Sequence, residues 1–197
     1  MAVPLRCCIQ TSSDVGGSVA GPTFDAVIRV GARGTSDTDD RPAFRAHKLL
    51  LCARSAYFRR LFFNSWPASS TVVTTQDKAD EIEIESIPLP ALRLALFFVY
   101  TDALPRSVLP VLSSEAGLAE CAALLDAAEL LQLSGMIATI DSLVAEFIRE
   151  ARAHAGLFKP LVQVQQLHGL ALKFSMPATQ RAAADFWSRL ASGSGAG

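Results

Sequence analysis

Three groups of residues in this chain have types and spacings that some catalytic or binding sites use. Glu81, Glu83 and Glu85 place carboxylates at every second position, which could supply paired acids for general acid–base catalysis. The Gly-Ala-Arg-Gly run at residues 31–34 could cradle a phosphate, and four cysteines with three histidines could ligate a metal ion. Each group therefore has to be weighed against a structural explanation.

The structural explanation is the better one for each group. The three glutamates alternate with Ile82 and Ile84, which is typical of a half-buried strand with a solvated acidic face. The turn at 31–34 lacks the lysine and the hydroxyl residue of a P-loop, so we interpret it as a hairpin turn. The cysteines and histidines have no metal-ligand spacing, and we expect His47 to be a packed or capping residue. The sequence predicts no enzyme, no metal site and no cofactor.

Composition indicates a folded protein without a nucleic-acid or membrane partner. Half of the 197 residues are apolar, and 18 basic residues nearly balance 19 acidic ones, so the cationic field that binds phosphates is missing. The segments 1–10 and 87–100 are too short or too interrupted for a signal peptide or a membrane span. We expect Cys7 and Cys8, whose modification stays open, and the two other cysteines to be reduced thiols in the cytoplasm or nucleus.

The hydrophobic pattern predicts a hairpin followed by a pair of short helices. Residues 24–30 and 43–46 are expected to form antiparallel strands, with a polar turn between them. Ser55 separates the two helices, and its hydroxyl can accept a hydrogen bond from the first turn of the second helix. One apolar face is predicted to run through both helices, formed by Leu50, Ala53, Tyr57, Phe58, Leu61 and Phe62.

The rest of the chain is predicted to be mostly helical. An exposed loop at 64–80, with a brief strand possible at Val72–Val73, precedes the acidic strand at 81–85. Amphipathic helices are expected over 88–100, 117–133, 137–148, 160–174 and 176–190. The third of these has its apolar stripe at Ile137, Ile140, Val144, Phe147 and Ile148.

Several segments, in this order, resemble the BTB/POZ family. The resemblance covers about residues 24–150, and the trailing helices are similar to the start of a BACK-type extension. It implies an α+β fold, with a small β-sheet capped by helical hairpins and followed by extra C-terminal helices. We expect a flexible segment at 1–22, the BTB/POZ domain at 23–152, a partial BACK-like extension at 153–191 and a flexible tail at 192–197. The matching segments are Phe24–Val27, Phe44–Lys48, Arg54–Phe58, Phe98–Thr101 and Ala127–Leu133.

The resemblance also implies a function and candidate site residues. The family serves as a protein-interaction module that self-associates or docks onto a cullin scaffold of a ubiquitin ligase. The chain is therefore expected to be an adaptor that links an unidentified substrate protein to a cullin-RING ligase in the ubiquitin conjugation pathway. Asp25 and Lys48 match a charged pocket near the family's dimer interface, either as a partly buried pair or as an ordinary surface salt bridge. The positions that match the cullin-docking surface are Phe63, Trp66, Leu94 and Tyr100.

A second function remains open. In many cullin-binding members an acid follows the apolar residue of the docking loop, but here Trp66 is followed by Pro67 and Ala68. The glycine that usually follows Tyr-Thr is Asp102 in this chain. Both departures count against cullin docking, and the missing acid favours the alternative of a homo- or hetero-oligomerising scaffold, for example in transcriptional regulation, without any ligase.

Overall fold

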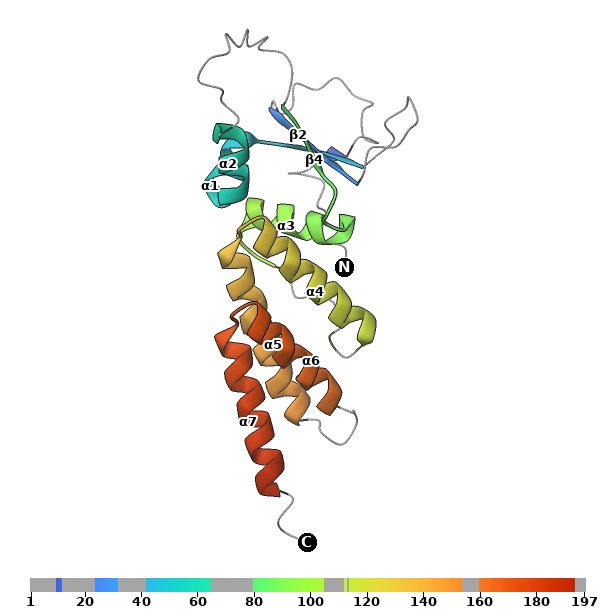
Figure 1. Ribbon diagram of the computed structural model, residues 1–197, viewed down its shortest axis with the longest axis vertical. Helices are drawn as coiled ribbons and strands as arrows, with labels where there is room; N and C mark the ends of the chain where they lie inside the picture. Colours follow the sequence, from blue (N-terminus) through green and yellow to red (C-terminus); the bar gives the residue numbers. More distant parts are fainter. Residues whose placement is uncertain are drawn as a thin grey trace. The chain divides into compact units, whose positions relative to one another are not determined.

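The computed structural model describes residues 10–11, 24–31, 42–64, 80–104, 112, 114–153 and 160–193. Its contacts divide the chain into two compact units, one formed by 1–102 with 130–133 and the other by 103–129 with 134–197. The elements labelled in Figure 1 are β1 (Gln10–Thr11), β2 (Ala26–Val30), β3 (Ala43–Ala46), α1 (Lys48–Arg54), α2 (Ala56–Asn64), β4 (Asp80–Ile84), α3 (Leu89–Thr101), α4 (Glu115–Leu130), α5 (Ser134–Ala153), α6 (Pro160–Lys173) and α7 (Pro177–Gly193).

The first unit is built on a four-stranded sheet with the strand order β1-β3-β2-β4. The antiparallel pairing predicted for β2 and β3 is confirmed, with Ala26 opposite Ala46 and Ile28 opposite Phe44. Every second side chain of β2 is buried, because successive side chains of a strand point to opposite faces. This sheet and the helices of both units form the predicted α+β fold.

The edge strand β4 shows the predicted alternation. Ile82 and Ile84 are buried, whereas Glu81 and Glu83 are exposed. β4 runs parallel to β2, and β1, which lies within the predicted flexible segment 1–22, pairs with β3. The sequence predicted neither pairing, because alternation identifies a strand's buried face and not its neighbour.

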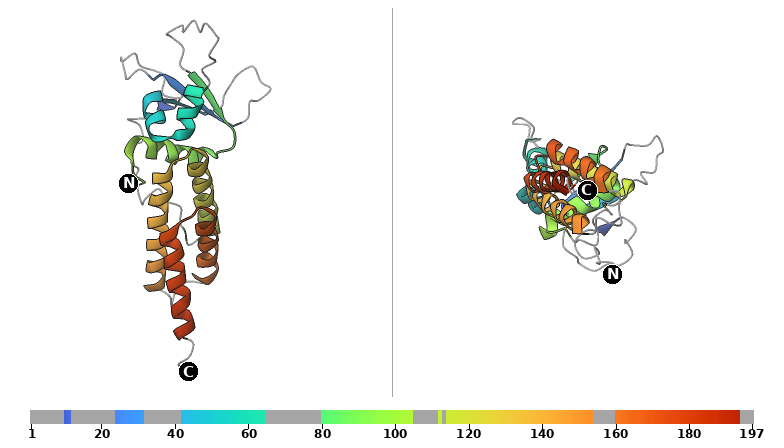
Figure 2. Two further views of the ribbon diagram at one scale, coloured as in Figure 1. Left: turned by 60° about the vertical axis from the view of Figure 1, so that its left-hand side comes forward. Right: turned by 90° about the horizontal axis from the view of Figure 1, so that it is seen from below.

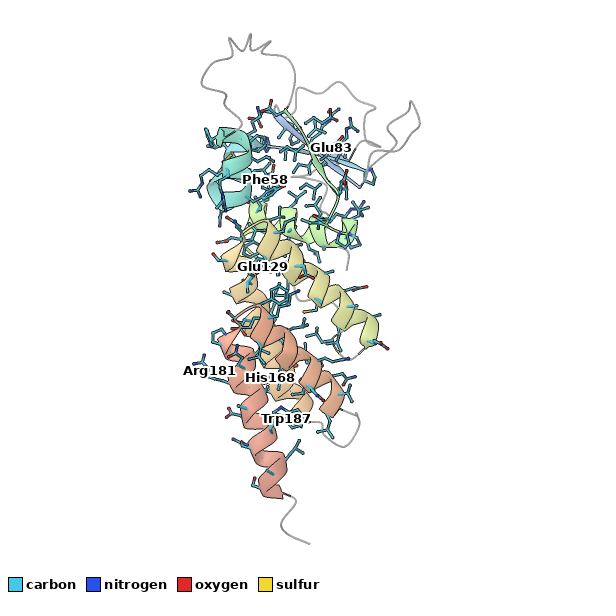
Figure 3. The ribbon with its side chains drawn as sticks, viewed as in Figure 1. Phe58, Glu83, Glu129, His168, Arg181 and Trp187 are labelled. Atoms are coloured by element: carbon cyan, nitrogen blue, oxygen red, sulfur yellow. The ribbon has the colours of Figure 1, made fainter. Side chains whose placement is uncertain are left out.

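Ser55 is the joint between α1 and α2, and the predicted cap is confirmed. The main-chain N–H of Phe58 donates to Ser55 Oγ at 3.2 Å. The same hydroxyl donates to the carbonyl of Leu131 at 2.6 Å, a contact between residues 76 positions apart. Ser55 and the neighbouring Phe58, which is labelled in Figure 3, have no exposed surface. A single buried hydroxyl therefore both starts α2 and ties it to the turn after α4.

The apolar face predicted to run through both helices is wrong for α1. This helix buries Leu51 and Cys52, whereas Leu50 and Ala53 are exposed. Ser55 has extended dihedral angles, φ −127° and ψ 120°, which interrupt the helical periodicity between α1 and α2. The phase of the apolar stripe is therefore reset at Ser55 and cannot be extrapolated from one helix to the other.

α3 has the predicted buried stripe at Leu92, Leu96 and Val99. It begins after Pro88, and Pro90 occupies one of its first two positions, where a missing N–H breaks no helical hydrogen bond. Asp102 ends the helix in the left-handed conformation, with φ 57°, and its N–H donates to the carbonyl of Phe98 at 2.8 Å. The family's usual glycine fits this position because glycine adopts positive φ without steric cost.

The second unit contains α4 to α7. α4 ends at Leu130 rather than at the predicted residue 133, because Gln132 has φ 55° and turns the chain before α5. Ile140, Val144 and Ile148 of the stripe predicted for α5 are buried, whereas Ile137 and Phe147 are only partly buried. Figure 2 shows α5, α6 and α7 lying side by side, and α5 packs against α7 along much of its length.

A buried carboxylate fixes the start of α7 against α5. Asp141 is 6% exposed and accepts hydrogen bonds from the N–H groups of Ala178 at 2.9 Å and Thr179 at 2.7 Å. The Thr179 hydroxyl donates in return to the carbonyl of Asp141 at 3.1 Å. Helix N-termini have free N–H groups and a positive dipole end, so a carboxylate from a neighbouring helix caps α7 as a local aspartate would.

Candidate docking surface

The predicted docking residues lie on two helices of the first unit. Phe63 is on the last turn of α2, and its side chain is 62% exposed. Leu94 and Tyr100 are partly buried residues of α3. Trp66 and the possible strand at Val72–Val73 lie outside the described residues. An aromatic ring as exposed as Phe63 has too few contacts within the chain to be a core residue.

Tyr100 is held in place by the residue that precedes α1. The main-chain N–H of His47 donates to the Tyr100 hydroxyl at 2.9 Å, and His47 Nδ1 lies 2.9 Å from the same oxygen. The Phe24 ring packs against the His47 ring, with 4.8 Å between centroids. His47 is thus a packed residue at the junction of a strand and a helix, as the sequence predicted. Its bond to Tyr100 was not predicted, because 53 residues separate the two.

The charged residues at the start of α1 form a chain of contacts rather than one pair. The Asp25 carboxylate accepts a hydrogen bond from the main-chain N–H of Lys48 at 2.7 Å. The Lys48 ammonium instead lies 2.6 Å from Asp80, with side chains 32% and 58% exposed. Asp25 therefore caps α1, whose own N-cap residue His47 makes no side-chain cap. The exposed Lys48–Asp80 pair contributes little stability, since solvent screens it.

A second ion pair connects the ends of α1 and α3. Arg54 lies 2.6 Å from the carboxylate of Asp102, and both side chains are largely exposed. Asp102 replaces the glycine usual in the family, and aspartate is among the few residues that tolerate the left-handed conformation. The ion pair offers a local reason for aspartate at this turn, although its exposure limits the energy gained.

Sequence reasoning missed an exposed apolar patch on α1. Leu49 is 79% exposed and Leu50 is 38% exposed, while Leu51 is fully buried. Consecutive helical residues point about 100° apart, so three adjacent leucines cannot all face one core. The Leu49-Leu50-Leu51 run was the signal that could have predicted an exposed leucine here.

Neither of the two cysteines in the described ranges is activated as a nucleophile. Cys52 and Cys121 are buried free thiols. Burial raises the pKa of Cys52, a nearby Asp25 raises it further, and Arg59 and Lys48 only partly oppose this. Burial alone raises the pKa of Cys121 to about 11. Both side chains therefore stay protonated at neutral pH, which suits packing rather than chemistry.

The described residues hold neither a metal-binding cluster nor a membrane-spanning helix. No group of three or more His, Cys, Asp or Glu side chains there could hold a metal ion. Within the same ranges, every helix is too short or too polar to cross a membrane. What this part of the chain presents is a set of apolar and aromatic side chains beside ion pairs, which is the chemistry of protein contacts.

Comparison with known proteins gives matches to one family. The BTB/POZ domain family model matches residues 21–147. Arabidopsis thaliana BTB/POZ and MATH domain-containing proteins 5 and 6 are 37% and 34% identical over 67 and 68 residues, about 34% of this chain. Each alignment spans only 14% of the length of the Arabidopsis protein.

Solved structures of the same kind of domain are also similar. The BTB domain of zebrafish PATZ1 has a TM-score of 0.41 at 23% identity, covering 62% of this chain and 76% of that chain. The BTB domain of human Gigaxonin has a TM-score of 0.37 at 19% identity, covering 57% of this chain and 70% of that chain.

Proposed function

The chain belongs to the BTB/POZ domain family, and we propose that this protein-interaction module acts as an adaptor between a cullin-RING ubiquitin ligase and a substrate protein. We assign this chain no catalysis of its own, no metal and no cofactor. We divide it into a BTB/POZ domain at 23–152 and a BACK-like extension at 153–191. We place its action in the cytoplasm or nucleus, where buried free thiols such as Cys52 and Cys121 stay reduced.

The exposed Phe63 ring is the observation that supports cullin docking most directly. Large aromatic side chains that enter a partner's desolvated pocket carry much of the energy of protein interfaces. Tyr100 adds a second ring, and its two contacts with His47 restrict its orientation before any partner binds. Side chains that are already ordered lose less conformational entropy on binding, which favours affinity. Leu94 and Trp66 complete the proposed surface.

Calorimetric titration of the full chain into a cullin N-terminal domain tests the adaptor function. We expect micromolar or tighter binding that weakens at least tenfold, or by about 1.4 kcal/mol, in Phe63→Ala, Trp66→Ala and Tyr100→Ala. Leu190→Ala is the matched control, because Leu190 is an exposed residue of α7 outside the proposed surface. The absence of heat with the unaltered chain, or equal weakening by the control, would refute cullin docking.

The exposed leucines of α1 favour a second candidate, a self-associating scaffold. A side chain as exposed as Leu49, next to Leu50, resembles the apolar centre of an interface more than an ordinary helix surface. Asp25 and Lys48 meet at the start of the same helix, and we propose that these two charged residues border the dimer contact. Light scattering should give a dimer mass that Leu49→Glu converts to a monomer mass. An unchanged mass in this variant would remove α1 from the contact.

A further inference from the structure

The two helices α1 and α2 carry positive charge and no acidic residue. Their basic residues are Lys48, Arg54, Arg59 and Arg60, whereas aspartate and glutamate are absent from the whole of residues 42–64. The complete chain, by contrast, has a formal net charge of −1. Positive charge is therefore concentrated on one pair of helices in a chain that is close to neutral.

The chain itself neutralises two of these four cations. Lys48 and Arg54 each lie 2.6 Å from an aspartate of the first unit. Arg59 and Arg60 are exposed, and neither forms an ion pair with a carboxylate among the described residues. The charge that is left without compensation on α1 and α2 is thus that of two adjacent arginines on α2.

Main-chain carbonyls hold both guanidinium groups in place. Arg59 Nε donates to the carbonyl of Cys52 at 3.2 Å, and Arg60 Nε donates to the carbonyl of Ala56 at 3.4 Å. A terminal nitrogen of Arg60 also donates to the side chain of Gln132. The terminal nitrogens of Arg59 have no hydrogen-bond partner among the described residues. A guanidinium that is already oriented loses less conformational entropy when a carboxylate binds its terminal nitrogens.

The exposed Phe63 ring shares one face of α2 with the two arginines. Consecutive helical residues project about 100° apart, so Phe63 projects between the directions of Arg59 and Arg60, one turn further along the helix. The buried Phe58, labelled in Figure 3, lies on the opposite side of α2 from Phe63 and Arg60. Aromatic and arginine side chains are both enriched at the centres of protein interfaces, so their combination on one exposed face favours a protein partner.

We propose that the protein surface that receives Phe63 is acidic, with carboxylates beside the pocket for the ring that pair with Arg59 and Arg60; this rests on the proposed adaptor function, in which the pocket belongs to the cullin. A second copy of α2 does not fit, because a two-fold contact would place arginine opposite arginine. Charges at the rim of an interface mainly raise the association rate, since opposite charges steer the two proteins together.

Surface plasmon resonance of the full chain on an immobilised cullin N-terminal domain tests this charge preference. We expect the association rate constant of the unaltered chain to fall about fivefold or more as sodium chloride rises from about 50 to about 500 mM. The double variant Arg59→Glu/Arg60→Glu should associate about tenfold more slowly at low salt, and added salt should no longer slow it. Arg181→Glu/Arg189→Glu, at exposed positions of α7, is the matched control, because it changes the net charge equally and should associate as the unaltered chain does.

The outcomes separate the charge preference from the adaptor function itself. Slow association of the α2 glutamate variant alone, with unchanged helical circular dichroism and fast association retained in Arg59→Lys/Arg60→Lys, supports an acidic partner surface. Binding that the α2 glutamate variant and the control weaken equally overturns it, and so does binding that does not depend on salt. In both of these cases the cullin still binds, so the adaptor function stands. No binding of the unaltered chain at any salt concentration overturns both proposals.

Discussion

Replacing Ser55 by alanine should destabilise the first unit strongly, although only one oxygen atom is removed. In the structure this oxygen accepts the N–H of Phe58 at 3.2 Å and donates to the carbonyl of Leu131 at 2.6 Å, and Ser55 is completely buried. Loss of the cap costs about 1 kcal/mol. A buried carbonyl without its donor costs about 1–3 kcal/mol more. Together, Ser55→Ala is expected to lower the free energy of unfolding by about 2–4 kcal/mol.

Urea unfolding followed by circular dichroism measures this change. With a slope of about 2 kcal/mol/M, the unfolding midpoint should fall by about 1–2 M. Ser142→Ala is the matched control, because the exposed Ser142 hydroxyl donates to the carbonyl of Ala138 in its own helix, and its loss should change stability by less than about 0.5 kcal/mol. Amide hydrogen exchange should locate the loss of protection in α2. A change below about 0.5 kcal/mol in Ser55→Ala would refute the reasoning that these two hydrogen bonds join the unit.

Three further predictions concern single residues. Asp141→Ala leaves the first N–H groups of α7 without an acceptor, so urea unfolding should show a loss of about 1–3 kcal/mol; a loss below 0.5 kcal/mol would contradict the cap. Burial raises the pKa of Cys121 from 9.0 to about 11, so the thiol loses its proton at a lower pH in the unfolded chain than in the folded one. The free energy of unfolding should therefore fall as the pH rises from 9 to 11, by up to about 2.7 kcal/mol. The Cys121→Ala variant should not lose this stability between pH 9 and 11. If its free energy of unfolding changed with pH as that of the unaltered chain does, the role of Cys121 would be contradicted. Asp102 has φ 57°, which alanine adopts at a steric cost, so thermal unfolding of Asp102→Ala should show a loss of about 1 kcal/mol in the free energy of unfolding. Asp102→Gly should be at least as stable as the unaltered chain. A loss in the glycine variant equal to that in the alanine variant would contradict the conformational argument.

The features that the sequence predicted correctly are those encoded by close neighbours. The Ser55 cap involves residues three positions apart, and the strand and helix stripes follow from alternation and from the helical repeat. The antiparallel pairing of β2 and β3 also follows from their proximity in the chain, with a run of mostly polar residues between them in the sequence. The family resemblance then placed these elements in one fold, which the family match at residues 21–147 supports.

The features that were missed depend on residues far apart or on interrupted periodicity. Tyr100 accepts a hydrogen bond from His47, 53 positions away, and the Leu131 carbonyl accepts one from Ser55, 76 positions away. No local sequence pattern connects residues so far apart. The parallel pairing of β4 with β2 is likewise a long-range contact. Leu50 and Ala53 were wrongly placed on the buried face because one stripe was extended through Ser55, where α1 ends.

The tie between Ser55 and Leu131 has a consequence for how the protein is made. The first unit includes residues 130–133, the last residue of α4 and the turn after it, which a ribosome adds only after the rest of α4. At about 5–20 residues per second, the 31 residues from 103 to 133 take about 2–6 s to synthesise. During this interval the β-sheet and α1 to α3 exist without the acceptor of the Ser55 hydroxyl. The first unit therefore cannot be complete when its first 102 residues have been synthesised. It is completed only when the segment 130–133 joins them.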